Sequence, residues 1–166
     1  MEKHTETTDW FTDGMTEFMA NNFGASVELL TRVLETDPDH KIARVSRGAA
    51  FLKMDRLNEA IDDFNRVVEQ YPEYARAFHL RGLARDQQGD HDGALEDFGT
   101  AIDLDPEYGA AYYSRVTLLT KLGREEEAMD DIQMVNHITN RNIEEFANEN
   151  NLWRSQQLRL EATLNG

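Results

Sequence analysis

Apolar residues recur at spacings of three and four along most of this chain, which is the pattern of helices with one buried face. Two such stretches are clearest in the middle of the sequence, at residues 76–87 and 94–104. Between them, residues 88–93 are polar and rich in glycine, and this composition predicts a tight turn. The predicted unit is therefore a helix, a turn and a second helix.

This unit recurs with a period of 34 residues. The three prolines of the chain have this spacing, and small residues stand at two fixed distances before them: Pro38, Pro72 and Pro106; Gly14, Gly48 and Gly82; Ser26, Ala60 and Ala94. Proline ends the second helix of each unit because it lacks an N–H and restricts the residue before it. A fixed period of this length is typical of a solenoid, in which each unit packs on the next to bury a shared core.

Four blocks of the sequence resemble tetratricopeptide repeats. The resemblance rests on an aromatic residue at block position 4, small residues at positions 8 and 20, a bulky residue at 24 and proline at 32. The blocks are residues 7–40, 41–74, 75–108 and 109–142. The family resemblance implies an all-α fold, a right-handed superhelical solenoid of four helix-turn-helix repeats.

Five residues depart from the family pattern. Arg44 replaces the aromatic residue of the second block, and the bulky residue at position 11 is replaced in the first and third blocks by Glu17 and Arg85. In the fourth block, Val116 and Asn140 stand where glycine and proline are expected. These departures predict looser packing in the outer repeats.

The two ends of the chain are assigned separately. Residues 1–6 are predicted to be an N-terminal tail, and residues 143–166 a long C-terminal capping helix. Asn142 and Glu145 resemble a capping box that would start this helix. Its apolar residues are predicted to contact the last repeat: Ile143, Phe146, Leu152, Trp153 and Leu160. Because the segment is longer than a cap requires, partner binding or self-association through Trp153 stays open.

Charged residues share the 34-residue period. Arginine recurs at position 7 and aspartate at position 23 of the last three blocks, and the first block lacks both: Arg47, Arg81 and Arg115; Asp63, Asp97 and Asp131. A guanidinium group and a carboxylate match as bidentate partners, so this pattern predicts ion pairs between helices, within a repeat or to its neighbour. The alternative is a row of arginines that binds an anionic ligand.

The composition excludes several classes of function. The net charge is −15, from 17 basic and 32 acidic residues, and such an excess repels nucleic acid and anionic lipid. No cysteine is present, which excludes thiolate metal sites and cysteine nucleophiles. No apolar run is long enough for a membrane span, so we expect a cytoplasmic protein.

No pattern in the sequence indicates catalysis. The five histidines are scattered without the spacing of a helical metal pair: His4, His40, His79, His91 and His137. Residues 90–93 resemble part of a calcium loop, but Gln88 and Gly99 occupy positions where that loop needs carboxylates. We therefore predict a protein that is not an enzyme and has no metal or cofactor.

The resemblance implies instead that the first helix of each repeat lines a concave groove that holds a peptide. The predicted groove residues are Phe11, Met15, Phe18, Ile42, Val45, Leu52, Arg76, His79, Tyr113 and Lys121. The predicted function is a protein–protein interaction adaptor that binds an amphipathic peptide segment of a partner. A self-assembling scaffold, in which a terminal segment of one copy occupies the groove of another, is the alternative. Phe11, Phe18 and Met19 are alternatively core residues of an end repeat.

One subset of the family holds the carboxyl terminus of chaperones with lysine, asparagine and arginine at set groove positions. In the two registers available here, these positions hold Phe11, Met15, Ser46, Arg76 and Leu80, or Val45, Ala49, Leu80, Ala110 and Ser114. The clamp is absent, which disfavours docking of a chaperone tail by that mechanism.

Overall fold

The structure, a computed structural model, describes residues 2–142, with side chains from residue 7 onward. The helices are α1 (Glu2–Met19), α2 (Phe23–Thr36), α3 (Lys41–Lys53), α4 (Leu57–Gln70), α5 (Ala75–Gln88), α6 (His91–Leu104) and α7 (Gly109–Lys121). A further helix occupies residues 125–142, and no strand occurs in this part of the chain. The all-α prediction is confirmed. The helix predicted for residues 143–166 lies outside the described residues.

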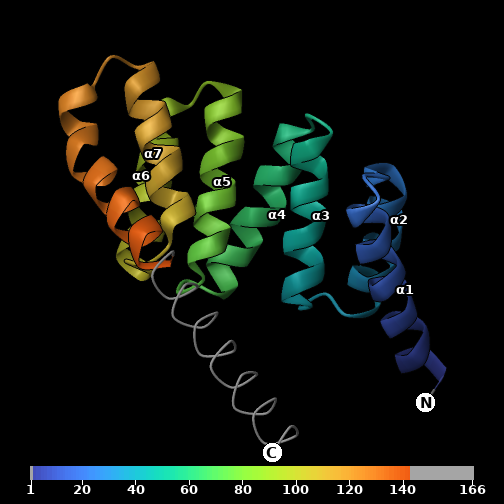
Figure 1. Cartoon of the computed structure of the whole chain (residues 1–166). Coiled ribbons are helices and arrows are strands. Elements are labelled where there is room, and N and C mark those ends of the chain that lie inside the picture. The colour runs from blue at the N-terminus through green and yellow to red at the C-terminus, as the bar shows by residue number, and fades with distance from the viewer. Residues whose placement is uncertain (1, 143–166) are drawn as a thin grey trace, which may run out of the picture.

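The helices form a row of pairs, with the N-terminal pair at one end and the helix of residues 125–142 at the other (Figure 1). We call the first helix of each pair helix A and the second helix B. Helices α1 and α3, α3 and α5, and α5 and α7 are in contact, whereas no contact joins α2 to α4 or α4 to α6. Because the A helices are closer together than the B helices, they form the inner layer of the stack.

One residue in each turn between the two helices of a pair has a left-handed backbone. These residues are 34 apart and have φ values of 63°, 58°, 89° and 72°: Asn21, Asp55, Gly89 and Gly123. Asparagine, aspartate and glycine tolerate this conformation better than other residues, so the sequence permits the same reversal four times. The turn predicted within residues 88–93 is confirmed, although α6 already begins at His91.

The close approach of helices A and B depends on glycine in the second and third pairs. A Cβ atom on Gly48 would lie 2.7 Å from the Phe64 ring, and one on Gly82 would lie 2.6 Å from the Phe98 ring. Both rings are almost completely buried. In the fourth pair valine replaces this glycine, and the residue that corresponds to the two phenylalanines, Ile132, is 38% exposed. The fourth pair is therefore less tightly closed, as predicted.

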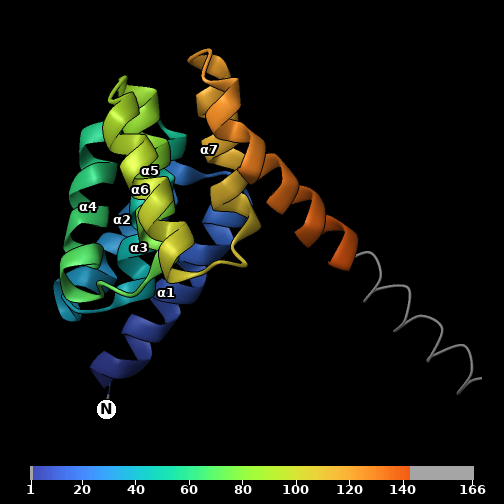
Figure 2. The same ribbon diagram turned by 90° about the vertical axis from the view of Figure 1, so that its left-hand side faces the viewer.

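Two helix boundaries differ from the sequence analysis. Helix α1 begins at Glu2, so residues 2–6 extend the first helix and do not form a separate tail. The helix that starts at residue 125 is unbroken through residue 142, which places Asn142 inside a helix and not at an N-cap. The physical reason is Asn140, which stands where the other blocks have a helix-ending proline. In Figure 2 this helix slants away from α7 toward its C-terminal end, and Met134, Val135 and Ile138 pack it against the cluster around Tyr112.

Candidate binding surface and repeat junctions

The predicted ion pairs between the periodic arginines and aspartates are present, and of the two arrangements left open the bidentate pairs lie within a repeat. Each arginine donates from Nε and Nη2 to the two carboxylate oxygens of an aspartate 16 residues later. The distances are 2.8 and 2.7 Å for Arg47–Asp63, 3.0 and 2.7 Å for Arg81–Asp97, and 2.7 and 2.6 Å for Arg115–Asp131. The pairs therefore join helix A to helix B in the last three repeats.

The same arginines also reach back to the preceding repeat. Nη1 of Arg47 donates to Thr31 at 3.1 Å, and Nη1 of Arg81 donates to Asn65 at 2.9 Å. Gly99 stands at the corresponding place before Arg115 and offers no side-chain acceptor. The junctions at Arg47 and Arg81 therefore each tie together three helices, and this use of the guanidinium donors favours the structural interpretation over a row that binds an anionic ligand.

Two of the residues that depart from the family pattern strengthen these junctions. The guanidinium of Arg44 lies 3.7 Å from Asp63 and donates to the Pro38 carbonyl, and burial lowers the pKa of this arginine. Arg85 donates to Asp97 at 3.0 Å and to the Gly93 carbonyl at 3.2 Å. These substitutions therefore do not loosen the packing of their repeats, because each gives the buried aspartate a second arginine.

The predicted groove residues differ widely in exposure. The exposed ones are Ile42, Arg76, Tyr113 and Lys121, and the half-buried ones are Phe11, Met15 and Phe18. The buried ones are Val45, Leu52 and His79. Val45 packs with Val67 and Ala77, and Leu52 belongs to the cluster around Phe64. These buried side chains shape the core beneath the A helices and offer no contact area to a peptide in this structure.

The half-buried aromatic residues of the first pair also serve its core. The Phe11 ring packs beside the cluster around Leu30 and lies 4.8 Å from the His40 ring. The Phe18 ring meets the Phe23 ring edge-on at 5.4 Å. Met19, in contrast, is 80% exposed and is not a core residue.

His79 is buried at the interface between the third and fourth helix pairs. One ring nitrogen forms a hydrogen bond of 3.0 Å with the Tyr108 hydroxyl, and the other forms one of 2.9 Å with the Ser114 hydroxyl. Burial, together with the nearby charge of Arg76, lowers the pKa of His79 to about 4. The ring is therefore neutral at pH 7 and does not act as a cationic contact for a ligand.

Lys121 is an exposed member of a small charged cluster. Its Nζ lies 3.1 Å from Oδ1 of Asp86, and the same oxygen lies 3.0 Å from Nδ1 of His91. The sequence analysis placed Lys121 in the groove and missed this aspartate, which lies one repeat earlier on the neighbouring A helix. Arg76 forms no ion pair or hydrogen bond with any residue in the described part of the chain, so it is the more available cation.

The structure also reveals two hollows that the sequence analysis did not find. They lie along the edge where loops join each pair to the next, and their lining includes Lys41, Tyr71, Tyr74 and Tyr108. Tyr74 and Tyr108 are 34 residues apart, as the last residue of their blocks. This periodicity could have pointed to a repeated surface at the loops. The sequence alone does not show that Lys41 reaches the tyrosines of the next loop.

Two kinds of site are not found within residues 2–142. No cluster of three or more histidine, aspartate or glutamate side chains in this part of the chain has the geometry to hold a metal ion. No helix described here has both the length and the apolar character to cross a membrane.

Comparison with known proteins identifies the family of this chain. A sequence profile described as a tetratricopeptide repeat matches residues 14–75 and 79–135, which is more than half of the chain. A search of curated proteins found no significant sequence match.

Solved structures share the fold. MamA (residues 41 to the end) from Desulfovibrio magneticus RS-1 has a TM-score of 0.76 and 24% identity, and the alignment covers 81% of this chain and 76% of that one. The second domain of human RPAP3, in complex with the HSP70 peptide SGPTIEEVD, has a TM-score of 0.65 and 25% identity, with coverage of 69% and 96%. The first domain of Spaghetti (RPAP3), bound to the HSP90 peptide SRMEEVD, has a TM-score of 0.67 and 19% identity, with coverage of 72% and 94%.

The profile match, the paired helices and the 34-residue period of glycine, alanine and proline agree with one another. The chain belongs to the tetratricopeptide repeat family, whose repeats are protein–protein interaction modules.

Proposed function

We propose that this protein is an adaptor whose A-helix face binds an amphipathic segment of a partner protein. The observation that carries the proposal is the mixture of exposed side chains on that face. Ile42 and Tyr113 are 41% and 66% exposed, and Met19 is 80% exposed. Exposed apolar and aromatic side chains beside the free cation Arg76 suit a ligand that is apolar with one or two acidic groups.

The absence of a catalytic arrangement in the described residues supports a binding role over an enzymatic one. The buried charged groups are arginine–aspartate pairs that join helices, and the buried histidine is held neutral between two hydroxyl groups. None of these groups lines either of the two hollows at the loop edge, where a substrate could bind. The RPAP3 domains bind chaperone peptides, but the carboxylate clamp is missing here, so we propose an internal segment of a different partner.

Site-specific photo-crosslinking tests the proposal. A photoreactive phenylalanine analogue is placed at Tyr113 on the A-helix face or, as the matched control, at Arg66, which is exposed on the B helix α4. We expect a specific crosslinked partner from the first position and none from the second, with mass spectrometry to identify the partner segment. Crosslinking to the same partner from Arg66 alone would place the binding surface on the outer layer and refute the proposal.

Self-assembly is the second candidate, and the end of the stack favours it. Met129 and Ile132, on the helix of residues 125–142, are 54% and 38% exposed where a further repeat would pack. An apolar end surface of this kind suits contact with another copy. Sedimentation over a concentration series tests this: a monomer throughout rejects it, and a mass that rises with concentration and falls in a Met129→Glu variant supports it.

A further inference from the structure

Two adjacent hollows lie on the edge formed by the loops between helix pairs. The first, of about 370 Å³, is lined by Lys41, Gln70, Tyr71, Pro72, Glu73 and Tyr74. The second, of about 360 Å³, is lined by Glu73, Tyr74, Ala75, Arg76, Leu104, Asp105 and Tyr108. They share Glu73 and Tyr74, so they form two neighbouring lobes of one surface. This edge is distinct from the A-helix face, and only Arg76 belongs to both.

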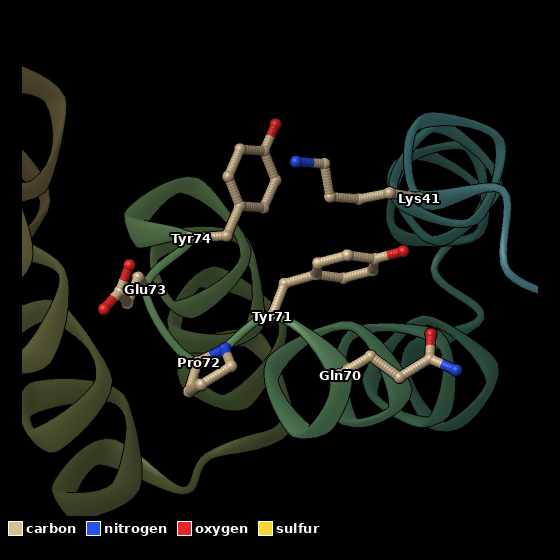
Figure 3. A pocket seen from close by; sticks show the side chains of 6 residues that line it. All are labelled: Lys41, Gln70, Tyr71, Pro72, Glu73 and Tyr74. Carbon is tan, nitrogen blue, oxygen red and sulfur yellow. The ribbon is translucent and has the colours of Figure 1, made fainter.

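The Lys41 ammonium group occupies the first lobe without a carboxylate partner. Its Nζ lies 5.0 Å from the centre of the Tyr71 ring and 4.7 Å from the centre of the Tyr74 ring. Figure 3 shows the side chain reaching toward the space between the two rings. It forms no hydrogen bond or ion pair with any residue in the described part of the chain. Cation–π contacts position an ammonium group but leave its N–H donors unused.

Arg76 gives the second lobe a similar unpaired cation. The other arginines on A helices are all paired with aspartates: Arg44, Arg47, Arg81, Arg85 and Arg115. Arg76 also stands in the first turn of α5, which has no side-chain N-cap. The uncapped N–H groups of a helix N-terminus add positive potential there. In a chain of net charge −15, two cations without an ion-pair partner in neighbouring lobes form an unusual local surface.

The acidic residues in the lining, Glu73 and Asp105, form no ion pair with these cations in the described part of the chain. Figure 3 shows the Glu73 side chain directed away from Lys41, on the other side of its loop. The Asp105 carboxylate already accepts the N–H of Glu107 at 3.1 Å. Asp39 also lies at this edge, where it accepts from Gln70 Nε2 at 2.9 Å, and it forms no ion pair with Lys41 or Arg76. Charges farther away are screened beyond about 8 Å at physiological salt. A carboxylate of a ligand can therefore reach Lys41 or Arg76 without displacing an existing ion pair.

We propose that this edge binds an extended acidic segment of a partner protein. One carboxylate of the segment pairs with Lys41, another pairs with Arg76, and an aliphatic side chain between them packs on the Tyr74 ring. The apolar part of the contact comes from ring faces that are already held in place by the proline-containing loop. The inference rests on the proposed adaptor function only in that the ligand is a protein segment.

Two short peptides test the proposal by solution NMR. The acidic probe is acetyl-Glu-Leu-Glu-Leu-Glu-amide, and its neutral control has glutamine in place of each glutamate. We expect the acidic peptide to cause saturable shifts in the side-chain signals of Lys41 and in the ring signals of Tyr71 and Tyr74, weakening as salt is raised. The neutral peptide should leave these signals unchanged.

Matched variants complete the experiment. Lys41→Met and Arg76→Gln should each weaken the acidic peptide about fivefold, the effect of losing one partly exposed ion pair. Lys53→Met, at the other end of α3, and Arg66→Gln, on α4, should leave affinity unchanged. The proposal is overturned if the control variants weaken the acidic peptide equally or if the acidic peptide causes no saturable shifts. It is also overturned if a peptide with lysine in place of each glutamate binds between the two tyrosines. Crosslinking through Tyr113 reports separately on the A-helix face, so the two proposals fail independently.

Discussion

The third and fourth helix pairs have the same residue pattern, but the ion pairs that join helix A to helix B differ between them. Asp97 in the third pair is 2% exposed and binds two arginines, Arg81 and Arg85. Among the described residues, Asp131 in the fourth pair binds Arg115 alone, and the Arg115 side chain is 28% exposed. A repeated sequence signature therefore does not give equal junctions, because the neighbours that complete each ion pair are not repeated.

Packing between the helices differs in the same direction. Gly82 lets the Phe98 ring lie against helix A of the third pair, whereas Val116 and Ile132 take these places in the fourth. Ile132 remains 38% exposed, against 1% for Phe98. We infer that the central repeats supply most of the stability of the stack, while the last one keeps apolar surface available for contact.

Loss of the third-pair aspartate should have the largest effect. Asp97→Ala leaves two guanidinium groups without their buried partner, so we expect a loss of about 3–5 kcal/mol in the free energy of unfolding. Asp131→Ala removes the partner of one more exposed arginine and should cost less, about 1.5–3 kcal/mol. Urea unfolding of both variants measures the difference.

A double-mutant cycle refines the same comparison. Arg81→Ala combined with Asp97→Ala should cost less than the sum of the single changes, because the two residues contact each other directly. Additive effects would show that the bidentate pair does not contribute as a unit.

Low pH should weaken the contacts that His79 makes between the third and fourth helix pairs. His79 has a pKa of about 4 in the folded protein, below the ordinary value of 6.5, so the unfolded chain binds more protons between these values. The stability due to neutral His79 is therefore present above pH 6.5 and is lost as the pH falls toward 4, by about 2 kcal/mol between pH 7 and pH 5. Urea unfolding at both pH values measures it.

A His79→Gln variant is the control for this pH dependence, since carboxylates also titrate as the pH approaches 4. The variant should lose less stability than the wild type on going from pH 7 to pH 5. Identical pH dependence in the two proteins would mean that the pKa of His79 is the same in the folded and unfolded states.

The same substitution at two glycines should have opposite effects. Gly82→Ala places a Cβ 2.6 Å from the Phe98 ring, and the overpacking should lower stability by about 1–3 kcal/mol. Gly99→Ala meets only Arg115 Nη1 at 3.6 Å, so the gain in helix propensity should raise stability by up to about 1 kcal/mol. Thermal unfolding of the two variants compares them, and destabilisation of equal size would contradict the packing argument.

The smallest effect is expected from giving Arg115 the acceptor that Arg81 has. Gly99→Asn reproduces the place of Asn65, which accepts from Arg81 at 2.9 Å. Relative to Gly99→Ala, the new hydrogen bond should add about 0.5–1.5 kcal/mol. Hydrogen exchange of residues 109–121 should slow in step with this gain. No difference between the asparagine and alanine variants would show that Arg115 does not reach across the junction.

The A-helix face shows how much of the candidate site could be predicted from the sequence. The family pattern led to ten groove residues, and their positions along the helices follow from a simple periodicity. That periodicity does not reveal how much of each side chain the neighbouring repeat covers. Val45 is buried by Val67 and Ala77, and His79 is buried by Tyr108, in both cases through residues more than 20 positions later.

By itself, the sequence determined the helical pairs, their 34-residue period and the arginine–aspartate pairing, because these depend on local spacing and on one-to-one charge complementarity. Only the tertiary structure decided that Arg44 and Arg85 reinforce the buried aspartates and that Asp86 pairs with Lys121. It alone decided that Lys41 reaches the tyrosines of the next loop. Long, flexible arginine and lysine side chains have many partners within reach, and the choice among them is fixed by how closely successive repeats approach each other.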